Sequence, residues 1–224
     1  MTANETKWVT FDCFGTLVDW QRGFRAILEP VAGDRTDELV HAYHEAELET
    51  EAEAPGRTYK EVLTLTLTRA AEAIGVALDD QDSQCLVNNW RSLPIFPDTE
   101  KSLKALREDG WRLAVLTNCD NDLFTQTRSV FPVPLDHVVT AQDVSSYKPG
   151  LAHFERFERD TGVDRRRWVH AAVSWWHDMC PAKELGLRRV WVDRENSGHD
   201  ASIVTARIPD LASLPDTLRR FDIR

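Results

Sequence analysis

Five short apolar runs, separated by helix-length segments, are the feature that most constrains what this chain can fold into. They are rich in β-branched residues and nearly continuous, which is typical of parallel strands buried on both faces of a sheet. The intervening segments Thr99–Asp109, Leu151–Thr161 and Pro181–Leu185 each end at or just before a glycine, a helix-terminating signal. The pattern predicts a right-handed parallel α/β sheet. The five runs are Trp8–Phe11, Leu113–Leu116, Val138–Thr140, Val169–Val173 and Val190–Val192.

A helical block interrupts this alternation after the first run. No strand-like run occurs between about Asp19 and Ser92, whereas Tyr59–Ile74 has the apolar spacing of an amphipathic helix and His41–Glu53 is acidic and helix-prone. Strand–helix alternation resumes after Pro94 and Pro97. We therefore predict an α/β core from residues 1–18 and 94–224, with an all-helical domain, residues 19–93, inserted into it.

Charge and composition exclude several classes of partner. The 224 residues include 27 Lys and Arg against 37 Asp and Glu, a net charge of −10, so nucleic acid and anionic membrane surfaces are not expected partners. No 18-residue apolar run is present, and the polar start Met1–Lys7 does not resemble a secretory signal. The four cysteines form no CxxC pair, which indicates reduced thiols in a cytoplasmic protein.

Polar residues follow several of the predicted strands at the point where each strand ends. Because carboxyl ends of parallel strands meet at one edge of the sheet, these side chains are expected to converge on a ligand crevice. Asp12 alone could equally be the N-cap of a helix, but the set as a whole indicates a site. Its members are Asp12, Gly15 and Thr16 after the first run, Thr117 and Asn118 after the second, Lys148 before Pro149, and Ser174 to Asp178 after the fourth.

This ordered set resembles the haloacid dehalogenase superfamily: Asp-x-x-Gly-Thr, then Thr-Asn, Lys-Pro and a final acidic motif. The resemblance covers nearly the whole chain, and it implies a Rossmann-like core in which residues 19–93 form the helical cap. It also implies that Asp12 is the nucleophile, that Thr16 and Thr117 are polar anchors, and that Lys148 holds charge in the site.

Two departures separate the chain from the magnesium-dependent phosphatases of that superfamily. The acid expected two residues after the nucleophile is Phe14, and the metal-binding acid of the last motif is Ser174. Because Mg²⁺ requires several oxygen ligands, these changes argue against a metal and a phosphoryl-transfer reaction. An aromatic residue and a serine at these positions are similar to the metal-free (S)-2-haloacid dehalogenases, so no cofactor is expected.

The resemblance implies nucleophilic catalysis by a carboxylate on a small 2-haloacid. Asp12 would displace the halide, and water would then hydrolyse the resulting ester to a 2-hydroxy acid. Lys148 would keep Asp12 ionised, and Asp178 would orient Lys148 and position the water. Asn118 is a candidate donor to the halide. The predicted apolar wall of the substrate pocket consists of Phe14, Trp20, Trp175 and Trp176, with Trp175 facing the substrate.

Other positions match this branch less well. The characterised enzymes have a halide-binding arginine at the start of the cap, but residues 41–45 here contain none, which leaves Arg57 or Arg69 as candidates. A tyrosine six residues after the lysine is replaced by Phe154, and an asparagine of the last motif by Trp175. The residues that bind the substrate are therefore expected to differ from those of the characterised (S)-2-haloacid dehalogenases.

Two further functions stay open from the sequence alone: a magnesium-dependent phosphatase with an altered site, and a non-catalytic protein that binds a ligand or partner. A soft-metal site at Cys13, Cys119 and Cys180 beside His177 is a weaker interpretation than small buried side chains. His41 and His44 share a helix face that is expected to contact solvent, as is the acidic run Glu45–Glu53. The resemblance leaves room for a homodimer, for which no residue pattern marks an interface.

Overall fold

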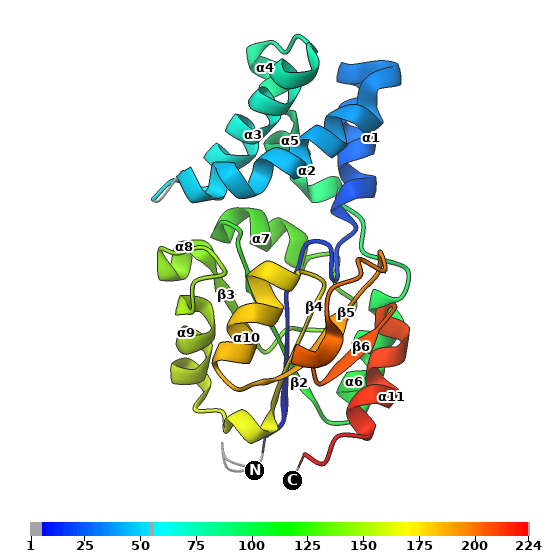
Figure 1. Cartoon of the computed structure of the whole chain (residues 1–224), viewed down its shortest axis with the longest axis vertical. Helices are drawn as coiled ribbons and strands as arrows, with labels where there is room; N and C mark the ends of the chain where they lie inside the picture. Colours follow the sequence, from blue (N-terminus) through cyan, green and yellow to red (C-terminus); the bar gives the residue numbers. More distant parts are fainter. Residues whose placement is uncertain (1–5, 54–55, 224) are drawn as a thin grey trace. The chain divides into compact units, whose positions relative to one another are not determined.

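The computed structural model describes residues 6–53 and 56–223, which divide into two compact units (Figure 1). The first, here called the α/β unit, lies within residues 1–18, 95–117 and 131–224 and contains the strands. The second, the helical unit, lies within residues 19–94 and 118–130. Residues 1–5, on which the expected lack of a secretory signal partly rests, are outside the described residues.

A six-stranded sheet of parallel neighbours forms the centre of the α/β unit, in the order β3-β2-β1-β4-β5-β6. The five predicted strands are confirmed, and β6 is the strand that the sequence pattern missed. It has three residues, of which only Ile208 is buried, so it lacks a continuous apolar run. The strands are β1 Trp8–Phe11, β2 Arg112–Thr117, β3 His137–Thr140, β4 Trp168–Ala172, β5 Arg188–Val192 and β6 Ala206–Ile208.

The chain changes direction across the sheet at β1. It passes from β1 to β2 and β3 on one side, and then crosses to β4, β5 and β6 on the other. Right-handed crossovers in the two directions place their helices on opposite faces of the sheet. Between them, at the carboxyl ends of β1 and β4, lies the position where open sheets of this kind bind ligands. Asp12 immediately follows β1 and is therefore at this switch point.

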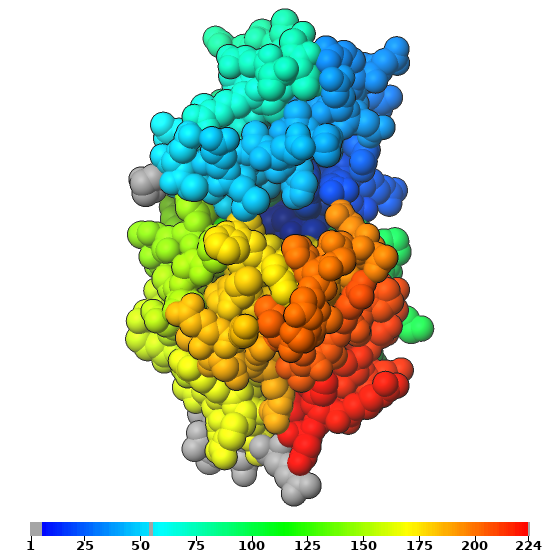
Figure 2. Space-filling view, in the orientation of Figure 1, coloured from blue at the N-terminus to red at the C-terminus, as the bar shows by residue number. Residues whose placement is uncertain are grey.

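Helices cover the sheet and bury its apolar side chains. Phe154 and Phe157 of α9 and Ala182 of α10 pack in one hydrophobic cluster with Trp8 and Trp168 of the strands. In Figure 2 the yellow to red segments that follow residue 150 form much of the visible surface of this unit. The helices are α6 Thr99–Glu108, α8 Ala141–Val144, α9 Ala152–Thr161, α10 Cys180–Glu184 and α11 Leu214–Arg219, with 3-10 turns η4 Arg165–Arg167, η6 Ala201–Ile203 and η7 Leu211–Ser213 and a π-helical turn η5 Trp175–Met179.

The helical unit is built around an aromatic core. Phe24 of α1, Tyr43 of α2 and the buried Trp90 pack edge to face, with ring centroids 5.1–6.3 Å apart. The predicted helix Tyr59–Ile74 is confirmed, and Thr58 caps it. The elements are α1 Trp20–Ala32, α2 Thr36–Glu53, α3 Tyr59–Ile74, α4 Asp80–Ser83, α5 Cys85–Asn88 and α7 Asn121–Arg128, with 3-10 turns η2 Gly33–Arg35 and η3 Trp90–Ser92.

Residues 118–130 group with the helical unit, which differs from the predicted boundaries of 1–18 and 94–224 for the core and 19–93 for the insertion. The reason is a set of hydrogen bonds between segments far apart in sequence. The Asp120 carboxylate accepts the N–H groups of Tyr59 and Lys60, at the start of α3, at 2.9 and 3.0 Å. The Trp90 indole donates to Thr127 of α7 at 3.0 Å.

The acidic run in α2 is not entirely solvated, so that expectation is wrong for Glu47. Its Oε1 accepts the hydroxyl groups of Tyr43 at 3.2 Å and Tyr59 at 2.9 Å. Burial and the negative charge of Glu47 raise the pKa of both tyrosines well above the usual value. Glu47 therefore joins α2 to α3.

Among the described helices, none is long and apolar enough to cross a membrane.

Candidate active site

The loop after β1 holds Asp12 in a fixed position. Gly15 adopts φ +88°, a left-handed conformation that favours glycine, and its N–H donates to the Val18 carbonyl at 2.8 Å. The N–H groups of Leu17 and Val18 both donate to the Cys13 carbonyl, at 2.8 and 3.0 Å. The sequence Asp12–Val18 therefore closes into a tight loop directly at the end of the central strand.

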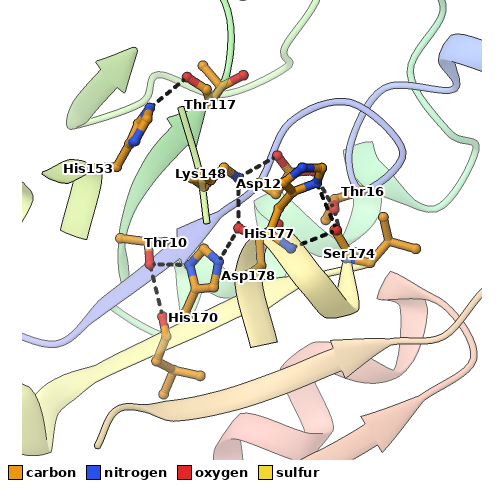
Figure 3. A network of polar contacts seen from close by, with 12 residues as sticks. Thr10, Asp12, Thr16, Thr117, Lys148, His153, His170, Ser174, His177 and Asp178 are labelled. Carbon is orange, nitrogen blue, oxygen red and sulfur yellow. Dashed lines mark hydrogen bonds and ion pairs between the residues drawn. The ribbon is translucent and has the colours of Figure 1, made fainter. Parts of the chain in front are cut away.

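Both oxygens of the Asp12 carboxylate accept a hydrogen bond (Figure 3). The Lys148 ammonium donates to Oδ1 at 2.8 Å, and the Thr16 hydroxyl donates to Oδ2 at 3.0 Å. Thr16 Oγ1 also accepts the N–H of Val173 at 3.0 Å. Because a backbone N–H can only donate, the hydroxyl proton of Thr16 is left for Asp12, so Thr16 fixes the rotation of the carboxylate.

Lys148 bridges Asp12 to a second buried carboxylate. Its Nζ lies 2.7 Å from Asp178 Oδ1, although the two residues are on different elements, and Lys148 is 2% exposed. Asp178 is 0% exposed and lies in the π-helical turn η5. Its Oδ2 is buried and has no hydrogen-bond partner among the described residues. The centre is therefore one cation between two anions, with one carboxylate oxygen left to accept a further donor.

Burial and charge act in opposite directions on these groups. Burial raises the pKa of Asp12 and the neighbouring charge of Asp178 adds to this, which outweighs the lowering by Lys148. Burial also disfavours the charged form of Asp178, but Lys148 and a hydrogen bond from His170 hold its pKa below the usual value. Burial opposes the charge on Lys148, yet the two carboxylates together raise its pKa. Asp12 is consequently the first of the two carboxylates to take up a proton as the pH falls.

Thr117 ends β2 with a buried hydroxyl that has no partner among the residues described. The backbone carbonyl of Thr117 lies 3.1 Å from Nε2 of buried His153. Since a carbonyl only accepts, that nitrogen carries the ring proton. Burial, followed by the charge of Lys148, lowers the pKa of His153 to about 3, so the ring stays neutral. Thr117 is thus held by its backbone while its hydroxyl is left to bind another group.

Ser174 begins the turn that presents Asp178. Its Oγ accepts the N–H of His177 at 3.1 Å and lies 3.1 Å from the Nδ1 of the same residue. A serine oxygen at the start of a helical turn satisfies an N–H group that would otherwise lack an acceptor. Ser174 therefore shapes this turn, whereas its predicted contact with substrate stays a prediction.

The two adjacent tryptophans have different environments. Trp175 packs edge to face on Trp191, with centroids 4.9 Å apart, and stacks on His199 at 4.9 Å and 9°. Trp176 is 58% exposed. Phe14 is half-buried and forms an isolated β-bridge with Val18 in the loop after β1. A place for any of these rings against a substrate remains a prediction.

Trp20 and Asn118 belong to the helical unit, and their roles in the site also remain predictions. The Trp20 ring contacts Phe24, Tyr43 and His44, at centroid distances of 5.2, 6.2 and 5.4 Å. The candidate substitutes for the missing arginine are not equivalent. Arg69 is paired with Glu53 at 2.7 Å, and Arg57 is exposed.

The donor set does not fit a magnesium ion. Asp12 and Asp178 both direct an oxygen to the Lys148 ammonium, and the Ser174 hydroxyl is engaged by His177. Within residues 6–53 and 56–223, no cluster of three or more His, Cys, Asp or Glu side chains has the arrangement of a metal site. All four cysteines are free thiols, with Cys13 and Cys119 buried.

Two residues linked to this centre, His170 directly and Thr10 through His170, are not among the candidates that the sequence suggests. His170 lies in β4 with Nε2 at 2.9 Å from Asp178 Oδ1, and Thr10 lies in β1 with its hydroxyl at 2.8 Å from His170 Nδ1. The sequence pattern predicts only that both lie in buried strands. The available signal was a polar residue in the middle of each apolar run, because a buried polar group requires a partner.

The chain is similar in sequence to known proteins. The family model of the haloacid dehalogenase-like hydrolases matches residues 6–179. The chain is 23% identical to an (S)-2-haloacid dehalogenase of Pseudomonas putida over 86% of each protein.

Two solved structures establish the likeness in fold. The crystal structure of the L-2-haloacid dehalogenase RSc1362 matches with a TM-score of 0.86 at 21% identity, covering 96% of this chain and all of the other. The L-2-haloacid dehalogenase of Xanthobacter autotrophicus with chloropropionic acid covalently bound matches with a TM-score of 0.81 at 18% identity, covering 96% and 99%.

Proposed function

The chain belongs to the haloacid dehalogenase-like hydrolases, and on this premise we propose that it hydrolyses the carbon–halogen bond of a small 2-haloacid without a metal. The relatives named above are 2-haloacid dehalogenases, and one was captured with a chloropropionic acid covalently bound. The products would be a halide ion and a 2-hydroxy acid.

The observation that carries the proposal is the Lys148 ammonium between two buried carboxylates, Asp12 and Asp178. It supplies the positive charge that keeps a carboxylate nucleophile ionised away from water. It also supplies, in an acidic chain, the local cation that an anionic substrate requires. Both roles are performed by the Lys148 ammonium, and neither requires the Mg²⁺ ion that a phosphatase of this superfamily binds through oxygen ligands.

In the first step, an oxygen of Asp12 attacks carbon 2 of the haloacid. A carbon–oxygen bond forms, the carbon–halogen bond breaks, and the halide leaves with the bonding electrons. Thr16 and Lys148 hold the nucleophile in place before the attack, which contributes orientation rather than new chemistry. The unpartnered hydroxyl of Thr117 is the proposed anchor for the substrate carboxylate.

In the second step, water attacks the ester carbonyl of Asp12 while Asp178 accepts a proton from it. The bond to the alkyl oxygen breaks, and the departing oxygen takes that proton from Asp178 to become the hydroxyl of the product. Asp12 returns to its carboxylate by releasing the second proton of the water to solvent. The unpartnered Oδ2 of Asp178 is the proposed acceptor for the water.

The helical unit is proposed to be the counterpart of the family's cap. Trp20 and Asn118 of this unit, and Phe14, Ser174 and Trp175 of the α/β unit, are each proposed to bind substrate. We further propose that the protein works in the cytoplasm, which its four free thiols support, and that it forms a homodimer. Light scattering after size-exclusion chromatography tests the dimer, since a monomeric mass near 25.6 kDa would contradict it.

The first test is halide release from (S)-2-chloropropionate, bromoacetate and fluoroacetate in the presence of EDTA. We expect stoichiometric halide and 2-hydroxy acid from at least one of them, at a rate that added Mg²⁺ does not change. Hydrolysis of an aryl phosphate that depends on Mg²⁺, without halide release, would instead support the altered phosphatase. Ligand binding without turnover of any of these compounds would support a binding protein.

Replacing Asp178 with asparagine should separate the two steps. An amide cannot take the proton of the attacking water, so the variant should release about one equivalent of halide per site and then stall as the Asp12 ester. Intact-mass spectrometry should show the added carboxyalkyl group, and peptide mapping should place it on Asp12. Asp34→Asn, at an exposed aspartate, is the control. Steady turnover by Asp178→Asn would remove Asp178 from the role of base.

A further inference from the structure

His170 is a buried histidine that the proposed mechanism leaves without a role. It lies in β4, is 0% exposed, and both of its ring nitrogens have partners (Figure 3). Nε2 is 2.9 Å from Asp178 Oδ1, and Nδ1 is 2.8 Å from Thr10 Oγ1. The ring therefore connects the reacting centre to the central strand β1.

The directions of the hydrogen bonds that link Trp168, Thr10 and His170 follow from which groups can only donate and which can accept. The Trp168 indole N–H can only donate, and it donates to Thr10 Oγ1 at 2.8 Å. The Thr10 hydroxyl has one proton to give, and its possible acceptors are His170 Nδ1 at 2.8 Å and the Val169 carbonyl at 3.5 Å. The shorter contact has the length of a hydrogen bond between a hydroxyl and a nitrogen, whereas 3.5 Å is beyond the usual range.

The direction of the hydrogen bond from Thr10 determines which nitrogen of the His170 ring carries the proton. When Nδ1 accepts from Thr10, the ring proton is on Nε2 and is donated to Asp178. The Phe154 ring packs edge to face on His170 at 5.0 Å. The hydrogen-bond geometry thus assigns the Nε2–H form to His170.

The donated proton orients the carboxylate of Asp178. Lys148 and His170 both bind Oδ1, at 2.7 and 2.9 Å, and Oδ2 is left without a partner among the described residues. Lys148 is shared with Asp12, and Asp12 loses its negative charge when it becomes an ester. The two ring nitrogens of His170 contact Thr10 and Asp178, so its hydrogen bond to Asp178 does not depend on the charge of Asp12.

We propose that His170, held in its Nε2–H form by Thr10, is a positioning residue that keeps Asp178 Oδ2 available to the water of the second step. This rests on the proposed function, since the ester on Asp12 is the species that the water attacks. The role differs from general packing because it requires a donor at one particular ring nitrogen.

A matched pair of variants tests which nitrogen matters. Glutamine places its amide nitrogen near the position of Nε2, whereas asparagine reaches only the position of Nδ1. His170→Asn should therefore release the first equivalent of halide normally, accumulate the Asp12 ester, and turn over about 10- to 100-fold more slowly, as when a hydrogen-bond partner that orients a metal-ligating side chain is lost. His170→Gln should keep turnover within a few-fold of the wild type. Equal losses in both variants without ester accumulation, or wild-type turnover by His170→Asn, would overturn the proposal.

Nitrogen-15 NMR of the imidazole rings tests the hydrogen bonding in the unmodified protein, without depending on activity or on the folding of a variant. His170 should carry its ring proton on Nε2 and none on Nδ1. Thr10→Ser should preserve that signal, and Thr10→Val should change it. A proton on Nδ1 would overturn the proposal. If the NMR result is as expected but the wild type releases no halide from any haloacid, the proposed function fails while the hydrogen-bond assignment stands.

Discussion

Replacing Asp12 with asparagine is expected to abolish halide release, with a loss of roughly 10⁴-fold or more, as when other covalent nucleophiles are removed. An amide oxygen carries no full negative charge and cannot form the ester intermediate. Halide release and the absence of any mass increase on the protein, measured after incubation with excess substrate, check this outcome. Turnover close to that of the wild type would exclude Asp12 as the nucleophile and with it the proposed mechanism.

The same variant should fold at least as stably as the wild type. The wild-type centre holds two buried carboxylates on a single ammonium, so removal of the charge of Asp12 leaves Lys148 and Asp178 as a balanced pair. Thermal unfolding should therefore show an unchanged or higher Tm at neutral pH. This measurement separates loss of the nucleophile from loss of the fold, because a misfolded protein would show a lower Tm.

Replacing Lys148 with methionine is expected to have the largest effect on stability. The change leaves Asp12 and Asp178 buried without their shared cation, and removing one partner of a buried ion pair costs about 3–5 kcal/mol. Chemical denaturation at pH 7 measures the loss. Lys101→Met, at an exposed lysine, is the control and should change the free energy of unfolding by less than about 0.5 kcal/mol. A similarly small effect of Lys148→Met would show that the carboxylates do not depend on this cation.

The pH dependence of Lys148→Met follows from the sign of the shift at Asp12. Burial already raises the pKa of Asp12 and Lys148 opposes this, so the variant's Asp12 should have a higher pKa still. Because only the carboxylate attacks, kcat/KM falls as the pH drops through this pKa, and the acid limb of any residual activity should move to higher pH. A carboxyl whose pKa is raised on folding takes up a proton more readily in the folded state, so the stability deficit should shrink as the pH falls. An unmoved acid limb would contradict the assignment.

The predicted strands and the order of the motifs were readable from local sequence because parallel strands are buried on both faces and leave continuous apolar runs. Asp12, Thr16 and Gly15 belong to one short loop whose hydrogen bonds are local, so their arrangement was also readable. The strand β6 was missed for the opposite reason, since it has a single buried residue. The assignment of residues 118–130 was missed because it depends on Asp120 reaching a helix about 60 residues earlier in the chain.

The sequence by itself determined the fold class, the residues of the loop after β1, and the replacement of two acids of the related phosphatases by Phe14 and Ser174, because each depends on residue type and on near neighbours. Only the tertiary structure decided that Lys148 is shared between Asp12 and Asp178, that His170 and Thr10 connect this centre to β1, and that Trp175 packs on Trp191. These contacts join strands and turns that are distant in sequence. Their distances are set by the sheet order and by side-chain packing, and neither leaves a periodic signal along the chain.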